Sequence, residues 1–122
     1  MMLEAAVLCL ALNIYHEGAK NEPIEGLFAI AQTTLNRAQR KPEKVCDVVF
    51  APAQFSWTIK PQPVEPGRAW DNAISVAKLS FHMADFTGGA THFHAFYVKP
   101  YWRRDMQLLG VYGNHLFYRI KK

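Results

Sequence analysis

One carboxylate in the N-terminal part of the chain stands where a general acid would be useful. Glu17 closes an apolar run that contains Leu10, Ala11 and Ile14, just before a short polar turn. The apolar residues recur at helical spacing, so they predict a helix with Glu17 near its C-terminal end. The negative end of the helix dipole and burial against Tyr15 would both disfavour an ionised carboxylate. A carboxylic acid that stays protonated near neutral pH suits general acid catalysis, although a solvated carboxylate at a helix end fits the same residues.

Histidines form a second group of candidate functional residues. His92 and His94 are two residues apart in a predicted strand, so they would share one face of it. With His115 on a neighbouring segment and Glu17 nearby, they could form a mononuclear metal site. They could equally line a cleft and hydrogen-bond to the backbone or to a substrate. Because the chain has no His-Glu-x-x-His motif, we expect no metal and no cofactor.

Aromatic side chains are concentrated in the predicted loops and strands. Trp57, Tyr97 and Trp102 are three of them. Rings with a polar edge suit stacking against sugars, and they suit the core of a small domain equally well. Serine or cysteine nucleophiles are disfavoured, because neither Ser56 nor Cys46 lies in a recognisable nucleophile motif.

The chain's 122 residues and half-apolar composition predict one domain, 1–122, with its own core. No apolar run is long enough to span a bilayer, so we expect no membrane insertion. The first fifteen residues lack a basic start and a small-x-small cleavage site, so we interpret them as a core helix and not a signal peptide. The expectation is therefore synthesis in the cytoplasm without a signal peptide. The net charge of +4 is scattered and does not predict nucleic-acid binding.

Two cysteines are present without metal-binding spacing. Cys9 falls on the apolar face of the first predicted helix, where a buried reduced thiol is the expected state. A disulfide with Cys46 is the alternative.

The predicted elements place these residues in an α+β domain. Helical periodicity predicts helices over 3–17, 24–39 and 67–86, and residues 44–50 suit either a short helix or a turn. Four prolines make 51–66 a loop. An aromatic-rich strand over 90–98 and a hairpin of 107–111 with 115–120 follow. The fold class is therefore about three helices followed by a small antiparallel sheet near the C-terminus.

Short motifs along nearly the whole chain resemble, in order, the cell-wall hydrolase family typified by the spore-cortex-lytic enzymes SleB and CwlJ. The matching stretches are IYHE (14–17), EG (25–26), AIA (29–31), LNR (35–37), VCDVV (45–49), QFSW (54–57), ATHFH (90–94), PYW (100–102) and GNHLFY (113–118). Each motif is weak alone, and their order is specific.

The resemblance implies a compact domain of lysozyme or transglycosylase type. It also implies cleavage of peptidoglycan between N-acetylmuramic acid and N-acetylglucosamine, with Glu17 as the catalytic acid. Glu22, one residue further along than the family's second glutamate, is the candidate second carboxylate. Candidates to bind the sugar's polar groups are Gln54, Ser56, Thr91, His92, Tyr97 and His115, with Trp57 and Trp102 as stacking walls.

The lack of an obvious second carboxylate favours a lytic transglycosylase over a hydrolytic muramidase or glucosaminidase. Two other classes remain open: a metal-dependent wall amidase or peptidase using His92, His94 and His115, and a non-catalytic glycan-binding module. A bare catalytic domain without a signal peptide resembles a phage or prophage endolysin. Such a protein would be a monomer that depends on a holin to reach the wall.

Overall fold

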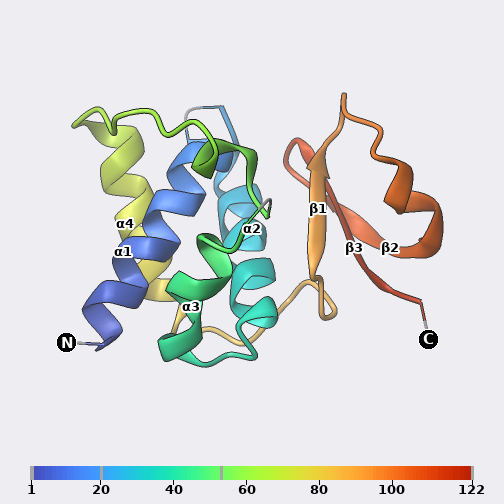
Figure 1. The fold of residues 1–122 in the computed structure, drawn as a ribbon, viewed down its shortest axis with the longest axis horizontal. Helices are drawn as coiled ribbons and strands as arrows, with labels where there is room; N and C mark the ends of the chain where they lie inside the picture. Colours follow the sequence, from blue (N-terminus) through green and yellow to red (C-terminus); the bar gives the residue numbers. More distant parts are fainter. Residues whose placement is uncertain (1, 20, 53, 122) are drawn as a thin grey trace.

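The computed structural model describes residues 2–19, 21–52 and 54–121, which form a helical lobe and a sheet lobe (Figure 1). The helical lobe contains α1 (Met2–Ile14), α2 (Ile24–Arg37), α3 (Pro42–Val49) and α4 (Arg68–Ser80). The sheet lobe contains β1 (His92–Ala95), β2 (Met106–Tyr112) and β3 (His115–Ile120). This arrangement confirms the predicted α+β class, and it places residues 44–49 in the helix α3, with Phe50 directly after its end.

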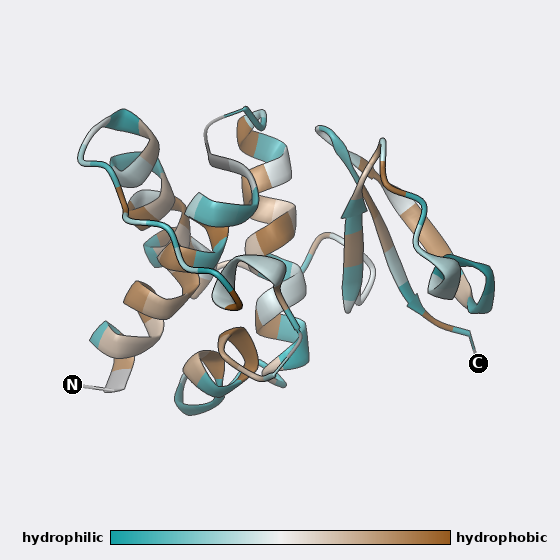
Figure 2. Cartoon of the chain, turned by 45° about the horizontal axis from the view of Figure 1, so that its top comes forward, coloured by the Kyte–Doolittle hydropathy of each residue, from teal (hydrophilic) through white to brown (hydrophobic). Residues whose placement is uncertain are grey.

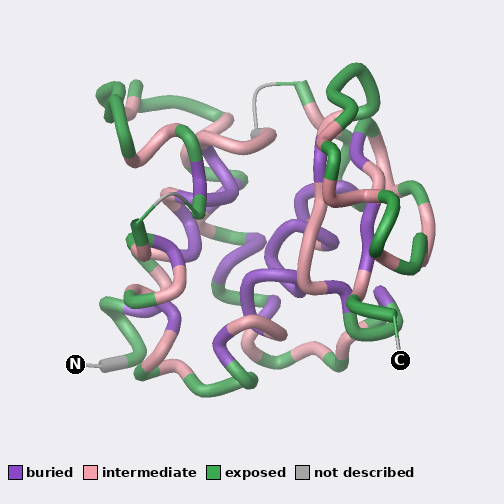
Figure 3. The backbone as a smooth tube through the Cα atoms, turned by 45° about the vertical axis from the view of Figure 1, so that its right-hand side comes forward, coloured by how far each residue is buried: buried purple, intermediate pink, exposed green. Residues whose placement is uncertain are grey.

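The main core lies among the helices. α1 and α2 contribute the largest group of fully buried apolar side chains, including Leu10, Ile14 and Ile30. Figures 2 and 3 show the same arrangement, with apolar and buried residues on the inward faces of the helices. Buried Asn13 donates to Thr34 Oγ1 at 3.2 Å and so ties α1 to α2. None of the described helices has the length and apolar character needed to cross a membrane.

The first predicted helix ends differently from the expectation. The α-helix stops at Ile14, and Tyr15–Ala19 form one π-helical turn that carries Glu17. A π-turn widens the helix by one residue, so it rotates the following side chains away from their α-helical positions. Tyr15 stays in the core, and its hydroxyl accepts a 3.1 Å hydrogen bond from the backbone N–H of Glu65. The π-turn thus separates buried Tyr15 from the partly exposed Glu17.

Two other predicted elements are too long. The helix predicted over 67–86 ends at Ser80, and the strand predicted over 90–98 is confined to His92–Ala95. Between them Asp85 organises a loop, because its carboxylate accepts hydrogen bonds from the N–H and hydroxyl of Thr87 and from the N–H of Gly89. Such local side-chain bonds compete with helix continuation. They also lower the pKa of Asp85, although its burial acts in the opposite direction.

The prediction that Cys9 is a reduced thiol is wrong. Cys9 of α1 and Cys46 of α3 form a disulfide, with their Cα atoms 5.3 Å apart. Helical periodicity placed Cys9 on an apolar face but could not show that α3 packs against that face. The disulfide therefore crosslinks α1 and α3 through two cysteines that are 37 residues apart in the sequence.

The sheet has the strand order β1-β3-β2, and all of its neighbours are antiparallel. The turn between β2 and β3 contains Gly113, whose φ of +59° is readily adopted by glycine. Phe93 of β1 pairs with Phe117 of β3, and Phe117 is fully buried. α2 is the helix that contacts both β1 and β2, so it forms the border between the two lobes.

Candidate active site

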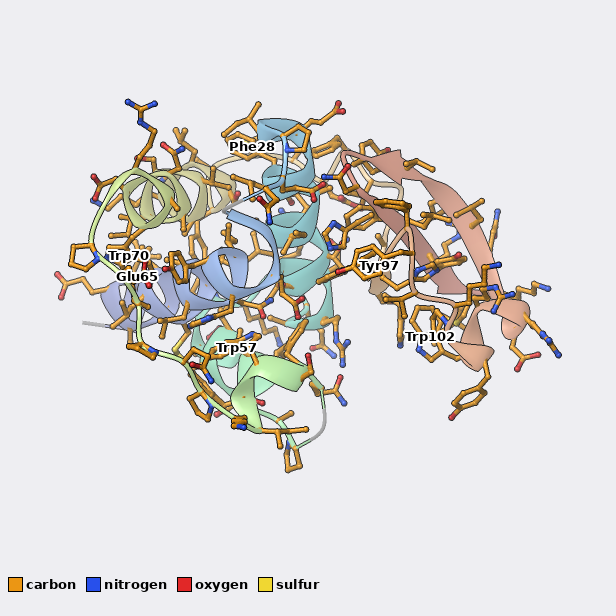
Figure 4. The ribbon with its side chains drawn as sticks, turned by 90° about the horizontal axis from the view of Figure 1, so that it is seen from above. Phe28, Trp57, Glu65, Trp70, Tyr97 and Trp102 are labelled. Carbon is orange, nitrogen blue, oxygen red and sulfur yellow. A yellow bond between two sulfur atoms is a disulfide. The ribbon has the colours of Figure 1, made fainter. Side chains whose placement is uncertain are left out.

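A cleft of about 1110 Å³ lies between the two lobes. This volume exceeds the range of roughly 300–1000 Å³ that is typical of sites for small ligands. The helical lobe contributes the π-turn, the end of α2 and the 54–63 loop, and the sheet lobe contributes β1 and the loops around it. In Figure 4 the labelled Trp57 lies on the helical side, whereas Tyr97 and Trp102 lie on the sheet side. The size and the two different walls suit a polymer held across the cleft.

Glu17 lies in the wall of this cleft. Burial raises the pKa of its carboxyl from 4.5 to about 7. Removal of the carboxyl from water, which disfavours its charged form, is the cause of that shift. Near neutral pH the group can therefore exist in both the acid and the carboxylate form, which is the property required of a catalytic acid that later acts as a base.

Most of the predicted site residues are brought together here. Those that line the cleft with Glu17 are Glu22, Gln54, Ser56, His92, Tyr97, Trp102 and His115. Tyr97 is strongly exposed, with three quarters of its surface accessible. They come from five separate segments of the sequence, so only the tertiary fold assembles them.

Two predicted site residues do not line the cleft. The ring of Trp57 stacks on His16 with centroids 4.4 Å apart, and its indole N–H donates to Asn13 Oδ1 at 2.8 Å. Trp57 therefore supports His16, which does line the cleft and which the sequence did not single out. The hydroxyl of Thr91 lies 2.9 Å from Nδ1 of His92, where it can orient the imidazole. Both residues lie directly behind the surface of the cleft.

The histidines do not converge on one point. His92 and His94 lie on one face of the sheet, whereas His115 pairs with Ala95 and so lies on the other. His94 Nε2 is 2.8 Å from the hydroxyl of Tyr118, and Nδ1 of His115 is 2.9 Å from Glu22. Among the residues that the structure describes, no group of three metal-ligating side chains has a suitable arrangement. In the part of the chain that the structure describes, the three histidines considered for a metal-dependent amidase therefore do not form one set of ligands.

The pKa shifts of His92 and His115 favour the neutral form of each imidazole. Burial lowers the pKa of His92, and the nearby charge of Arg37 lowers it further. Burial likewise lowers the pKa of His115, and this effect outweighs the opposing attraction of Glu22. Both imidazoles are therefore neutral at pH 7, where they can accept or donate hydrogen bonds to a sugar.

Glu22 connects the two lobes. Its side chain is only 2% exposed, and its carboxylate accepts hydrogen bonds from the backbone N–H of Asn114 (2.6 Å) and from Nδ1 of His115 (2.9 Å). A Cβ atom on Gly26 or Gly113 would overlap the Glu22 carboxylate, so both glycines make room for it. These contacts attach the start of α2 to the β2–β3 turn.

We expect Glu22→Ala to lower the free energy of unfolding by about 2 kcal/mol, because two donors lose a charged acceptor. Glu22→Gln should lose less, since its amide oxygen can still accept from Asn114. Urea denaturation of both variants measures this difference, with activity assayed well below their unfolding midpoints. An inactive but fully stable Glu22→Gln protein would instead identify Glu22 as a second catalytic carboxylate.

Comparisons with known proteins were made for both sequence and structure. The profile of the Cell Wall Hydrolase family matches residues 21–118, a stretch that begins four residues after Glu17. No curated protein sequence matches the chain.

Two solved structures share the fold. The catalytic domain of the Bacillus cereus SleB protein superposes with a TM-score of 0.74 at 23% identity, covering 94% of this chain and 91% of that one. The catalytic domain of the germination-specific lytic transglycosylase SleB from Bacillus anthracis gives a TM-score of 0.71 at 23% identity, with 93% of each chain covered. The fold is thus that of the SleB catalytic domain, and the profile match over most of the sequence shows that this chain belongs to the Cell Wall Hydrolase family.

Proposed function

We propose that this protein cleaves the glycan strand of peptidoglycan as a lytic transglycosylase, with Glu17 as its general acid and base. The observation that carries the proposal is a carboxyl group with a pKa of about 7 in the wall of a large cleft. Family membership supports a cell-wall substrate. The similar Bacillus anthracis domain is described as a lytic transglycosylase, which favours this reaction over others.

The first step breaks the bond between the anomeric carbon of N-acetylmuramic acid and O4 of N-acetylglucosamine. Protonated Glu17 donates its proton to O4, which leaves as a hydroxyl while positive charge develops at the anomeric carbon. In the second step the Glu17 carboxylate removes the proton from the 6-hydroxyl of the muramic acid, and O6 bonds to the anomeric carbon. The product is a 1,6-anhydro sugar, no water is consumed, and Glu17 is protonated again.

The arrangement of the carboxylates supports this path over hydrolysis. Among the described residues that line the cleft, Glu17 and Glu22 are the two carboxylic acids. Both hydrolytic mechanisms need a second carboxylate that can contact water or the anomeric carbon. Glu22 is almost fully buried and is hydrogen-bonded to Asn114 and His115, so it is poorly placed for that role. A transglycosylase uses one carboxyl group for both steps.

Mass spectrometry of the soluble products from purified peptidoglycan tests the proposal. We expect anhydromuramyl products. Reducing-end products, which are heavier by one water, would identify a muramidase or glucosaminidase instead. Intact wall binding without any released product would support the non-catalytic binding module.

The pH dependence of activity provides a second test. Since the reaction begins with protonated Glu17, and burial places its pKa at about 7, kcat/KM should be level below pH 7 and fall at higher pH. The rate of solubilising peptidoglycan, measured at constant ionic strength between about pH 3 and pH 9, gives this profile and covers both the ordinary and the raised pKa. A decline centred near the ordinary carboxyl pKa of 4.5 would show that Glu17 is solvated and would contradict the assignment.

A further inference from the structure

Arg37 places a positive charge at the surface of the cleft. It occupies the last turn of α2 and lines the cleft close to β1. Its Nη1 donates a 3.4 Å hydrogen bond to the carbonyl of Thr91, and its guanidinium carbon lies 5.9 Å from the centre of the Phe55 ring. These contacts position the guanidinium beside Phe55 and Thr91, and they occupy one of its five N–H donors.

No carboxylate in the described part of the chain forms an ion pair with Arg37. Glu22, which shares the cleft, binds His115, and Asp85 binds its own loop. Arg37 is nevertheless half-buried, and burial lowers its pKa. A partly desolvated cation without a counter-ion is unfavourable, and buried arginines are usually paired. The site is therefore suited to an anion that arrives with the substrate.

The position of Arg37 points to a substituent of the sugar and not to the reacting atoms. Positive charge develops at the anomeric carbon as the glycosidic bond breaks, and a cation beside it would oppose that change. The hydrogen bond from Arg37 to the carbonyl of Thr91 places its guanidinium against the residue that precedes β1, and its charge lowers the pKa of His92 in β1. Arg37 therefore lies at the β1 wall of the cleft.

Peptidoglycan carries its carboxylates on the stem peptide, which is attached through the lactyl group of muramic acid. When the peptide is attached, that lactyl group is an amide and the glycan itself is uncharged. A guanidinium presents a planar pair of N–H donors that matches a carboxylate. We propose that Arg37 binds a stem-peptide carboxylate, so that the enzyme prefers glycan strands that bear charged peptides. This inference rests on the proposed cleavage of peptidoglycan by the same cleft.

A comparison of substrates and variants tests the proposal. Soluble glycan strands with intact stem peptides are compared with the same strands after carbodiimide coupling to methylamine, which converts their carboxylates to neutral amides. Wild-type kcat/KM should be about tenfold lower on the neutral strands, as expected for one charged hydrogen bond. Arg37→Met should cleave both substrates at similar rates, close to that of the wild type on neutral strands. Arg37→Lys should keep part of the preference, because it keeps the charge without the planar fork.

Controls separate this role from a structural one. Arg68→Met removes an exposed arginine from the first turn of α4 and should keep the wild-type preference. A wild-type enzyme without a preference would overturn the proposal, as would an Arg37→Met protein that loses activity equally on both substrates. In both cases anhydro products would still be formed, so the proposed reaction would stand. If the wild type releases no products from either kind of strand, the proposed transglycosylase reaction itself is wrong, and the inference about Arg37 is wrong with it.

Peptide-free strands identify the carboxylate. Removing the peptides with an amidase leaves the lactyl carboxylate of muramic acid as the remaining anion. Wild-type rates on these strands should match those on the neutralised strands. Rates equal to those on intact strands would contradict binding of a stem-peptide carboxylate.

Discussion

Glu17→Gln is expected to reduce kcat on peptidoglycan by about 10³-fold, because it removes the proton donor while preserving the shape of the side chain.

The Glu17→Gln substitution should also stabilise the protein at alkaline pH. Wild-type Glu17 has a pKa of about 7 when folded and near 4.5 when unfolded, so the folded state binds more protons between these values. The stabilising effect of the buried acid is complete below pH 4.5 and is lost as the pH rises through 7.

A neutral glutamine has no such pH dependence. The difference in free energy of unfolding between Glu17→Gln and the wild type should therefore grow from pH 4.5 to 7 and reach at most about 3 kcal/mol above pH 8. Partial exposure of Glu17 to solvent makes this an upper value. Urea denaturation at pH 5 and pH 8, together with product analysis, measures both effects on the same samples.

Glu43→Gln is the matched control, because Glu43 is exposed on α3 and does not line the cleft. It should leave the activity and the pH dependence of stability close to those of the wild type. If Glu17→Gln retained activity within tenfold of the wild type, Glu17 would not be the general acid. If it lost activity without gaining stability at pH 8, burial would not be the source of the raised pKa.

Loss of the Cys9–Cys46 disulfide should produce the largest change in stability. The crosslink joins residues 37 positions apart, and closing a loop of that length reduces the entropy of the unfolded chain. The chain-entropy relation predicts a stabilisation of about 4 kcal/mol. For a domain of this size, that corresponds to a decrease in Tm of about 15 °C on reduction. Thermal unfolding with and without dithiothreitol provides the measurement.

The double variant Cys9→Ala/Cys46→Ala separates the disulfide from other effects of the reductant. It should unfold near the Tm of the reduced wild type, and dithiothreitol should not change that temperature. Neither cysteine lines the cleft, so both proteins should remain active at temperatures where they are folded. A Tm that is insensitive to reduction would contradict a stabilising crosslink between α1 and α3.

The sequence alone determined the local elements with strong periodicity. The apolar pattern of α2 predicted its start at Ile24 and its end within two residues. The turn at Gly113 and the flanking apolar residues predicted the hairpin of β2 and β3, because turn chemistry acts over a few residues. The apolar run before Glu17 left two alternatives, a buried carboxyl group with a raised pKa and a solvated carboxylate, and its burial in the structure supports the first. The predictions of α2 and of the hairpin are correct because residues that are close together in the sequence determine these elements.

Only the tertiary structure decided which distant residues meet. Cys9 pairs with Cys46 because α3 packs on α1, and Glu22 bonds to His115 because the β2–β3 turn lies over the start of α2. The register of β1 with β3 places His115 on the opposite face from His94, which separates the candidate metal ligands. Such contacts depend on the packing of whole elements.

The cleft itself is also a tertiary feature. Arg37 belongs to one of the short motifs of the sequence, yet no local pattern reveals that it lines a cleft and has no carboxylate partner among the described residues. The Trp57 side chain is of a type that stacks on sugars. In the structure its ring packs on His16 and bonds to Asn13, and it does not line the cleft. Residue type therefore predicted which chemistry is available, whereas burial and the approach of distant segments decided where each group can act.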